Sequence, residues 1–270
     1  MKPLVLKFGG ELLEQPERLR EIVKAVGNIA ATGPLVIVHG GGREIDEALR
    51  CAGIEKRQVD GLRITDEATL NVVVAVLAGT VNTRFVAHLN AAGVAAVGLT
   101  GADGAIGLSE AAAPHIAGDG RVVELGRVGI PTIQGRTRLL QTLVDEGFVP
   151  VIACIGMQPD GLLLNVNADT FAGRLAWRLG ARRLVIAGTT PGMLGTDGTT
   201  VPVVQSSAIT HLTTNGTATA GMIAKLRACD DALAHGVDDV MIVDGRDPMA
   251  LMTAAGDAVP QSGTRVAREI

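Results

Sequence analysis

Short runs of apolar residues constrain the fold of this chain more than any other feature of its sequence. Residues within a run do not alternate between apolar and polar, so both faces of the corresponding strand are expected to be covered, as in a parallel sheet. Stretches with apolar residues at helical spacing separate the runs. This alternation predicts an α/β fold, a three-layer α/β/α sandwich around a mostly parallel sheet. The strands are expected at 4–8, 35–38, 95–99, 149–155, 184–187 and, as the final strand, 239–243, and the longer helices at 19–30, 67–78, 139–146, 171–179 and 222–235.

The composition narrows the classes of function. The chain carries a formal net charge of -4. This argues against general binding of nucleic acid, which needs cations to neutralise phosphates. The three cysteines, Cys51, Cys154 and Cys229, lie far apart without a C-x-x-C pair, and the five histidines are scattered. We therefore expect neither a disulfide framework nor a zinc site, and no metal-binding residue in the chain.

Hydropathy and chain organisation bear on location and domain count. No segment reaches the ~18 continuous apolar residues of a membrane helix. The N-terminus runs directly into the first expected strand, without the apolar span of a signal peptide. We expect a soluble, cytoplasmic protein with no membrane partner. No linker, repeat or shift in composition divides the chain, so residues 1–270 are expected to form one unit.

The sequence NVNAD at 165–169 is the centre of the predicted site. It lies between an apolar run and a helical pattern, where Asn and Asp cap the first turn of a helix, and capping alone would explain it. Its position argues for more, because ligands of open α/β sheets bind beyond the carboxyl ends of the strands. We interpret Asp169 as the middle of a phosphate site built from both halves of the chain. The flanking glycine-rich loops and single lysines lie at 7–10, 39–42, 188–192 and 220–225.

Two lysines stand out in these segments. Lys7 interrupts an aliphatic strand at its carboxyl end, so it must reach solvent, pair with an acid or bind a ligand. Lys225 is expected early in a helix, where a cation is unfavourable unless an anion is near. Glycines at 9–10 and 40–42 leave backbone N–H groups open to an anion, although a plain turn is the simpler explanation for either loop alone. His39, beside the second glycine run, is expected to be structural.

No common phosphate or hydrolase motif is present, since the sequence lacks G-x-x-x-x-G-K-[ST], H-E-x-x-H and G-x-S-x-G. Instead, a set of short segments resembles the N-acetylglutamate kinases of the amino-acid kinase superfamily. The segments occur in the order of that family and span nearly the whole chain. They are VLKFGG at 5–10, VHGGG at 38–42, GLRITD at 61–66, GLTGADG at 98–104, NVNAD at 165–169, TPG at 190–192, GMIAK at 221–225 and GT at 263–264.

The resemblance implies a reaction and a set of residues for it. MgATP would phosphorylate the γ-carboxylate of N-acetyl-L-glutamate, yielding an acyl phosphate and ADP on the route to ornithine and arginine. Lys7 and Lys225 would stabilise the transferring phosphoryl group, and Asp169 would hold both lysines in place. The acetylamino acid is expected at Gly41, Gly42, Arg63 (on its α-carboxylate) and Asn165, and ATP with its phosphates at Gly9, Gly10, Thr189, Thr190, Pro191, Gly192, Met193, Leu194, Thr217, Ala218 and Thr219.

The same resemblance implies an organisation. The fold would be that of the amino-acid kinases, with an acetylamino-acid-binding lobe at 1–181 and a nucleotide-binding lobe at 182–270. By the same resemblance, we expect the chain to lack the N-terminal helical extension associated in the family with arginine-inhibited hexamers. An arginine-insensitive homodimer is therefore expected, with the apolar helix at 67–78 as its interface. A carboxylate nucleophile is already ionised at neutral pH, so Asp169 is expected to orient the lysines and not to act as a base.

Departures from the family pattern leave alternatives open. Thr189 stands where the family usually has Asp, Ala102 where Lys is common and Ala224 where Pro is common, whereas both lysines and Asp169 are retained. One alternative is a kinase for N-acetyl-2-aminoadipate, because one methylene gives only about 1–3 kcal/mol of discrimination. Another is a non-catalytic subunit that binds an acetylamino acid, which Thr189 would favour. Carbamate, aspartate and nucleoside-monophosphate kinases share the fold but match the segments less well.

Overall fold

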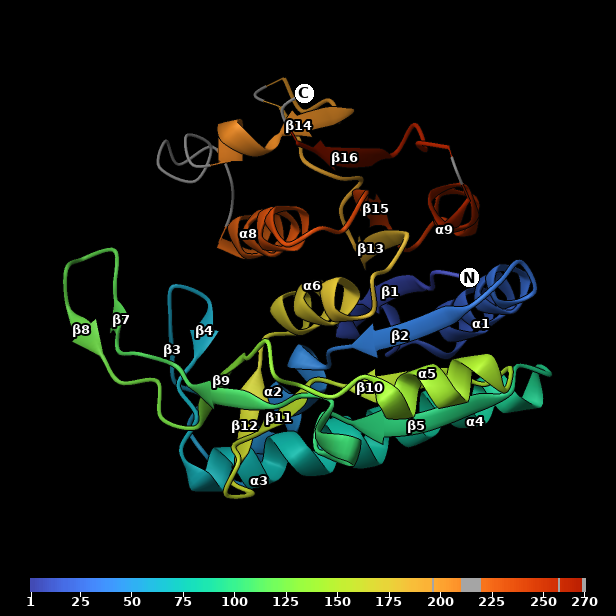
Figure 1. Cartoon of the computed structure of the whole chain (residues 1–270). Helices are drawn as coiled ribbons and strands as arrows, with labels where there is room; N and C mark the ends of the chain where they lie inside the picture. The colour runs from blue at the N-terminus through green and yellow to red at the C-terminus, as the bar shows by residue number, and fades with distance from the viewer. Residues whose placement is uncertain (196, 210–219, 257, 269–270) are drawn as a thin grey trace.

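A mostly parallel sheet forms the centre of the structure (Figure 1). The computed structural model describes residues 1–195, 197–209, 220–256 and 258–268, and within them this sheet has eight strands. Their spatial order is β14–β16–β15–β13–β1–β2–β10–β5, and every neighbouring pair is parallel except β15–β16. The strands are β1 (Leu4–Phe8), β2 (Leu35–His39), β5 (Ala96–Thr100), β10 (Val149–Ala153), β13 (Arg183–Gly188), β14 (Val203–Gln205), β15 (Val240–Asp244) and β16 (Gly263–Ala267).

Helices cover both faces of this sheet, which confirms the predicted three-layer α/β/α fold. One face carries α5, α6 and α8, and the other carries α1, α4 and α9 (Figure 1). Right-handed crossovers explain the division, because the chain runs from β1 outward to β5 and then returns through β10 to β13. The helices are α1 (Pro16–Ala30), α4 (Thr83–Ala91), α5 (Arg138–Asp145), α6 (Ala168–Arg178), α8 (Ala220–Ala234) and α9 (Pro248–Ala255), with α2 (Gly42–Cys51) following β2.

The helix predicted at 67–78 is longer than expected. α3 (Glu67–Val74), the π-helix η2 (Ala75–Asn82) and α4 form one continuous helix of 25 residues, capped at its start by the Asp66 carboxylate. By length and composition alone, it is the one helix of the described residues that could cross a membrane, and 39% of its most apolar stretch is buried. Core helices of soluble proteins pass the same test, and Leu77 and Phe85 are buried against the sheet.

Two strands of the main sheet were not predicted. The expectation that 239–243 is the final strand was wrong, because β16 follows it and brings β14 alongside. β14 forms the edge of the sheet and has two exposed residues. β16, between β14 and β15, is mostly buried, but it begins with Gly263 and Thr264 and has an exposed Arg265. Neither strand therefore has a continuous apolar run. Arg265 in β16 also turns outward to pair with Asp239, Nε to Oδ1, at 2.9 Å.

Shorter strands gather beyond the carboxyl ends of the main sheet (Figure 1). The region from 101 to 134 contributes β6 and β9, which pair antiparallel, and the β7–β8 hairpin. A second hairpin, β3–β4, projects beside the first (Figure 1). The strands are β3 (Gln58–Val59), β4 (Leu62–Arg63), β6 (Ser109–Ala111), β7 (His115–Ile116), β8 (Val122–Val123), β9 (Val128–Pro131), β11 (Ile155–Met157) and β12 (Leu163–Val166).

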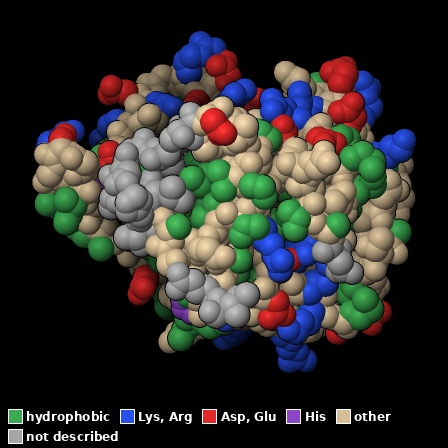
Figure 2. Space-filling view, turned by 90° about the horizontal axis from the view of Figure 1, so that it is seen from above, with side chains coloured by type: hydrophobic (Ala, Val, Ile, Leu, Met, Phe, Trp, Pro, Cys, Tyr) green, Lys and Arg blue, Asp and Glu red, His purple; other side chains and the backbone are tan. Residues whose placement is uncertain are grey.

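The central strand β1 places a charge inside this framework. It pairs with β2 on one side and β13 on the other, and all five of its residues are buried. Lys7 is the one charged residue of the strand and lies one residue before its end. On the face drawn in Figure 2, acidic and basic side chains are interspersed.

Candidate active site

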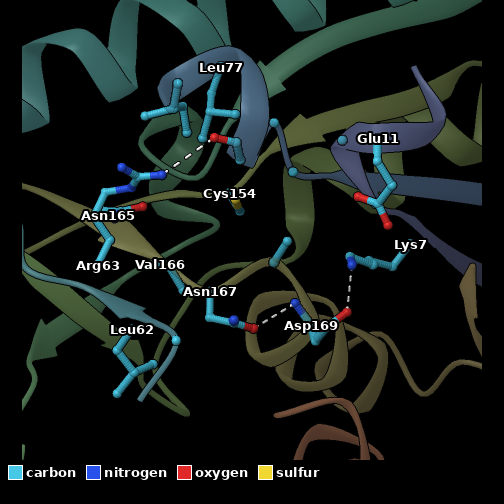
Figure 3. A pocket seen from close by; sticks show the side chains of 18 of the residues that line it. Lys7, Glu11, Leu62, Arg63, Leu77, Cys154, Asn165, Val166, Asn167 and Asp169 are labelled. Carbon is cyan, nitrogen blue, oxygen red and sulfur yellow. Dashed lines mark hydrogen bonds and ion pairs between the residues drawn. The ribbon is translucent and has the colours of Figure 1, made fainter. Parts of the chain in front are cut away.

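A cavity of about 270 Å³ lies beyond the carboxyl ends of β1 and β2 (Figure 3). Its walls come from segments far apart in the sequence, including the starts of α2 and α6. The predicted loop at 189–194 does not line this cavity, and the predicted residues Thr217, Ala218 and Thr219 lie outside the described part of the chain. The cavity brings together these predicted site residues: Lys7, Gly9, Gly10, Gly41, Gly42, Arg63, Asn165, Asp169 and Lys225.

Lys7 and Asp169 form a buried ion pair at the cavity (Figure 3). The Lys7 Nζ lies 2.7 Å from the Asp169 Oδ1, and the two side chains are 7% and 8% exposed. Burial alone would lower the pKa of Lys7, but the charge of Asp169 and a hydrogen bond to it, helped by the charge of Glu11, hold that pKa above its ordinary value. Lys7 is therefore a cation at neutral pH, although it is almost out of contact with water.

The start of α6 fixes the position of Asp169. The Asn167 Oδ1 accepts hydrogen bonds from the backbone N–H groups of Asp169 at 2.9 Å and Thr170 at 3.1 Å, which caps the helix. Asp169 lies in the first turn, where the helix dipole favours a carboxylate. Asn167 also lines the cavity and was missed as a site residue. Its position, two residues before the Asp at a strand-to-helix junction, was the signal that could have found it.

The two glycine-rich loops pack directly on each other. A Cβ on Gly10 would lie 2.4 Å from the Cα of Gly41, and a Cβ on Gly41 would lie 2.8 Å from Leu77. A side chain at either position would push the loops apart, so both glycines are needed for this close approach. Gly42 begins α2, whose first-turn N–H groups have no partner within the helix. The wall made by these loops therefore consists of backbone, as an anion site requires.

Arg63 reaches the cavity from the β3–β4 hairpin. Its Nη2 donates to the Asp46 carboxylate and to the Gly42 carbonyl, the latter at 3.4 Å. Its Nη1 is buried without a partner among the described residues. Burial opposes a fall in the pKa of Asp46, but hydrogen bonds from Lys56 and Arg63 hold that pKa below its ordinary value. Asp46 thus orients the guanidinium and leaves one nitrogen free to donate, which suits a carboxylate ligand.

The tip of the same hairpin is held by its neighbour. Asp60 and Gly61 have positive φ angles of 46° and 79°, as in the tight turn of a two-residue hairpin. The Asp60 carboxylate accepts hydrogen bonds from His115 Nε2 at 2.8 Å and from the Gly118 N–H at 3.0 Å, both in or beside the β7–β8 hairpin. Asn165, on the adjacent small sheet, donates its Nδ2 to the Thr65 hydroxyl at 3.1 Å, which orients its amide.

Lys225 and Glu11 both lie near the end of β13. A Cβ on Gly188 would lie 3.4 Å from the Lys225 Cε and 3.9 Å from the Glu11 Oε1, so both side chains use the space left by this glycine. Both also line the cavity. Lys225 lies near the start of α8, from the second half of the chain, whereas Lys7 lies in the first strand. The cavity therefore holds two ammonium groups from opposite ends of the sequence.

His39 is structural, as expected. It is fully buried, its Nε2 accepts a hydrogen bond from Asn82 Nδ2 at 3.0 Å, and its Nδ1 donates to the Gly40 carbonyl at 3.1 Å. These partners assign the neutral tautomer. Burial lowers its pKa to about 4. His39 is thus an uncharged support beneath the glycine loop and not part of the cavity lining.

Comparison with known proteins identifies the family. Residues 2–244 match the Amino acid kinase family. The chain belongs to the amino acid kinase family. Acetylglutamate kinases from Novosphingobium aromaticivorans and Granulibacter bethesdensis are 38% and 39% identical to it over 261 and 260 residues. These alignments cover 93% and 92% of this chain and 86% and 85% of the two relatives.

Two solved structures share the fold of this chain. An N-acetylglutamate synthase from Neisseria gonorrhoeae, complexed with coenzyme A and N-acetyl-glutamate, superimposes with a TM-score of 0.84 at 25% identity. All of this chain is covered, but it spans only 60% of the synthase. Carbamate kinase from Giardia lamblia bound to AMP-PNP superimposes with a TM-score of 0.68 at 15% identity over 99% of both chains, a likeness of fold alone.

The segments at 190–192 and 263–264, both part of the family resemblance, pack on each other. A Cβ on Gly192 would lie 2.4 Å from the Thr264 hydroxyl, and the φ of Gly192 is 89°. The Thr264 hydroxyl accepts a hydrogen bond from the Met193 N–H at 2.8 Å and donates to the Val201 carbonyl at 2.7 Å. A residue with a side chain would neither adopt this φ readily nor fit here. The loop after β13 is therefore held in a fixed shape.

Proposed function

We propose that this chain is an acetylglutamate kinase, which transfers the γ-phosphoryl group of ATP to the γ-carboxylate of N-acetyl-L-glutamate. The products are N-acetyl-glutamyl 5-phosphate and ADP, in a step of arginine biosynthesis. Membership of the amino acid kinase family and the curated relatives that carry this name, at 38% and 39% identity, support the assignment.

The observation that carries the proposal is the Lys7–Asp169 pair in a cavity that Lys225 also lines. The presence of Lys7, Asp169 and Lys225 in one cavity argues against a non-catalytic binding subunit. Two lysines aimed at one cavity suit a reaction that concentrates negative charge there.

The reaction must bring two anions together. A carboxylate acceptor has a pKa of about 4.3, so it is ionised at neutral pH and attacks the phosphorus without a base. Two unit charges ~4 Å apart repel by about 4 kcal/mol at an effective dielectric constant near 20. Lys7 and Lys225 offset this repulsion and the charge that spreads over the phosphoryl oxygens during transfer. Asp169 holds Lys7 in place and charged, which is a positioning role.

The lining of the cavity fits Mg²⁺ that arrives with ATP better than a metal held by the protein. The described residues contain no group of three or more His, Cys, Asp or Glu side chains that could hold a metal. Mg²⁺ in phosphoryl-transfer sites is bound by phosphate oxygens, waters and only one or two carboxylates. When bound, it neutralises charge on the phosphates. Two acidic side chains, Glu11 and Asp169, line the cavity, and Asp169 is engaged with Lys7.

The acetylamino acid is assigned to the side of the cavity formed by the hairpin and the second glycine loop. The free Nη1 of Arg63 is placed to receive its α-carboxylate, with Asp46 fixing the guanidinium. Asn165 and the backbone of Gly41 and Gly42 supply neutral donors for the remaining polar groups. The β7–β8 hairpin, through His115 and Asp60, supports the position of Arg63.

The nucleotide is assigned to the second part of the chain, so that 1–181 forms an acetylamino-acid lobe and 182–270 a nucleotide lobe. The loop from Thr189 to Leu194 follows β13 of this second lobe, and Lys225 lies in its helix α8. Gly9 and Gly10 line the same cavity as Lys225. The absence of an Asp at Thr189 removes a charge from this loop and leaves the two lysines and Asp169 unaffected.

Trapping of the acyl phosphate with hydroxylamine tests the assignment. With ATP and Mg²⁺, N-acetylglutamate should give hydroxamate far faster than N-acetyl-2-aminoadipate. Lys7→Ala should abolish most of the hydroxamate formed from N-acetylglutamate. Lys2→Ala is the matched control, because Lys2 makes an exposed ion pair with Asp238. A preference for N-acetyl-2-aminoadipate would leave the proposed phosphoryl-transfer mechanism in place but would exclude the assignment to arginine biosynthesis. No product with either substrate from folded protein would remove the enzymatic assignment.

We also propose that the chain is a cytoplasmic homodimer that binds small molecules and no nucleic acid or membrane. The outward side of α3 and η2 is uncharged at Asn71, Ala75 and Gly79, which are exposed. Small uncharged residues allow two helices to approach closely. Light scattering should give a dimer for the unaltered chain and a monomer for Ala75→Arg. A monomeric unaltered chain would rule out this interface.

A further inference from the structure

Glu11 is an acidic side chain in a cavity that is proposed to hold anions. It follows Gly9 and Gly10 directly, and its carboxylate lies in the same part of the cavity as Lys7 (Figure 3). The Glu11 Oε1 and the Lys225 Nζ lie 3.9 Å and 4.0 Å from the position that a Cβ on Gly188 would take. The carboxylate therefore stands where the phosphates would have to meet the two lysines.

The local backbone holds Glu11 in this place. It lies in the short helix η1 (Gly10–Leu12), and Leu12 and Leu13 on its other side are fully buried. A Cβ on Gly9 would lie 2.3 Å from the Glu11 Oε1, so the carboxylate occupies space that any other residue at position 9 would fill. The turn thus anchors its two leucines in the core and turns Glu11 toward the cavity.

The carboxylate of Glu11 has no ion-pair or hydrogen-bond partner among the described residues. Lys7 pairs with Asp169 instead, at 2.7 Å. A free carboxylate at this position repels every phosphate that enters, which makes it a poor choice for a site that needs only to bind ATP. A divalent cation between them reverses the sign, since it attracts both the carboxylate and the phosphate oxygens.

We propose that Glu11 is a ligand of the Mg²⁺ ion that accompanies ATP. Mg²⁺ takes oxygen ligands and in such sites adds one or two carboxylates to the phosphate oxygens and waters. Of the two acidic side chains in the cavity lining, Asp169 is committed to Lys7, so Glu11 is the one available to the metal. The proposal rests on the kinase assignment and adds to it the residue that recognises the metal.

A different role would give a different signature. If Glu11 instead paired with Lys225 once the nucleotide entered, it would support metal-free and metal-bound nucleotide equally. The metal role predicts opposite effects on the two forms, because removing the negative charge relieves repulsion from the free nucleotide and removes a ligand from the complexed one.

Calorimetry with AMP-PNP separates these roles, with one titration in Mg²⁺ and one in EDTA. In Glu11→Gln the affinity for Mg·AMP-PNP should fall about 10-fold or more, as for loss of a residue that tunes a metal site. The affinity for metal-free AMP-PNP should stay the same or rise. Glu11→Asp should keep part of the preference for the Mg²⁺ complex. Glu17→Gln, which removes a charge that is 77% exposed and paired with Arg20, is the control and should change neither affinity.

Each outcome bears on the proposal. An unchanged ratio of the two affinities in Glu11→Gln, with a normal unfolding temperature, would overturn the metal role. An equal fall in both affinities would overturn the metal role and would indicate that Glu11 pairs with Lys225. Failure of the unaltered chain to bind AMP-PNP in either titration would overturn the kinase assignment and this inference with it.

Discussion

Replacing Asp169 by Asn tests the buried ion pair on which the proposed chemistry depends. The change removes a charge but almost no volume, and leaves the Lys7 side chain 7% exposed beside a neutral amide. For a 2.7 Å pair, an effective dielectric constant of 20 gives a lost attraction of about 6 kcal/mol. Because Lys7 can shed its proton, the loss of stability should be nearer the roughly 3–5 kcal/mol typical of a broken buried pair.

The pH dependence of stability should also change sign. In the unaltered chain the raised pKa of Lys7 adds stability that is complete below the ordinary value of 10.5 and is lost as pH rises through the folded-state pKa. Without Asp169, burial dominates and the pKa of Lys7 falls below 10.5. The unfolded chain then binds the extra proton, so the variant should gain stability as pH rises through the lowered pKa.

Urea unfolding at neutral and alkaline pH measures both effects. The matched control is Asp238→Asn, which breaks a Lys–Asp pair of 2.9 Å between side chains that are 61% and 63% exposed. Its cost should be about 0–1 kcal/mol, because exposed pairs are screened and mobile. If Asp169→Asn cost no more than this control at neutral pH, and showed no gain at alkaline pH, the reasoning about the buried pair would be refuted.

Four further predictions follow from the same geometry. Lys225→Ala should lower kcat by about 10²–10³ with a smaller change in KM, as for loss of a donor to the transition state, and an unaltered kcat would exclude that role. Arg63→Ala should weaken acetylamino-acid binding by about 1.5–3 kcal/mol in calorimetry and leave AMP-PNP binding intact. Gly10→Ala should destabilise the fold by about 1–3 kcal/mol in urea unfolding, because its Cβ would lie 2.4 Å from the Gly41 Cα. Folding lowers the pKa of His39 from 6.5 to about 4, so between these pH values the unfolded chain binds more protons than the folded chain. The free energy of unfolding should therefore fall by up to about 3 kcal/mol as the pH drops from 6.5 to 4. His39→Gln should flatten that part of the pH profile, and an unchanged profile would show that another group causes it.

The central sheet was predictable because its strands are buried on both faces. β1, β2 and β10 consist entirely of buried residues, so almost no polar residue interrupts them. The edge strand β14 has two exposed residues, and its neighbour β16 contains Gly263, Thr264 and the exposed Arg265, so neither left such a signal. The long helix was cut short at 78 because Gly79, Thr80 and Asn82 interrupt its apolar pattern. Asn82 is in fact 4% exposed, and its amide is satisfied by His39 and by the Val151 carbonyl, two partners that only the tertiary fold supplies.

The site was predictable where its residues follow strands and not where their partners are remote. Lys7 and Asp169 could be located because the loops at the carboxyl ends of parallel strands converge. The sequence gives no sign that Asp46 would orient Arg63, since the contact joins a helix to a hairpin. The direction of Glu11 was equally hidden, because it depends on the absence of a side chain at Gly9.

The arrangement of charge in the cavity explains how one residue pair can serve both the fold and the reaction. A lysine in a central strand loses the water that would otherwise stabilise its charge, so it needs a partner before any substrate is present. Asp169 supplies that partner and is itself fixed by the Asn167 cap, so the pair cannot relax toward solvent. The cost of desolvating Lys7 is therefore met when the chain folds and not when substrates bind. In the proposed reaction, incoming phosphate oxygens would meet a cation that is already dry, charged and oriented. Such preorganisation gives a buried charge more effect on a transition state than a solvated one.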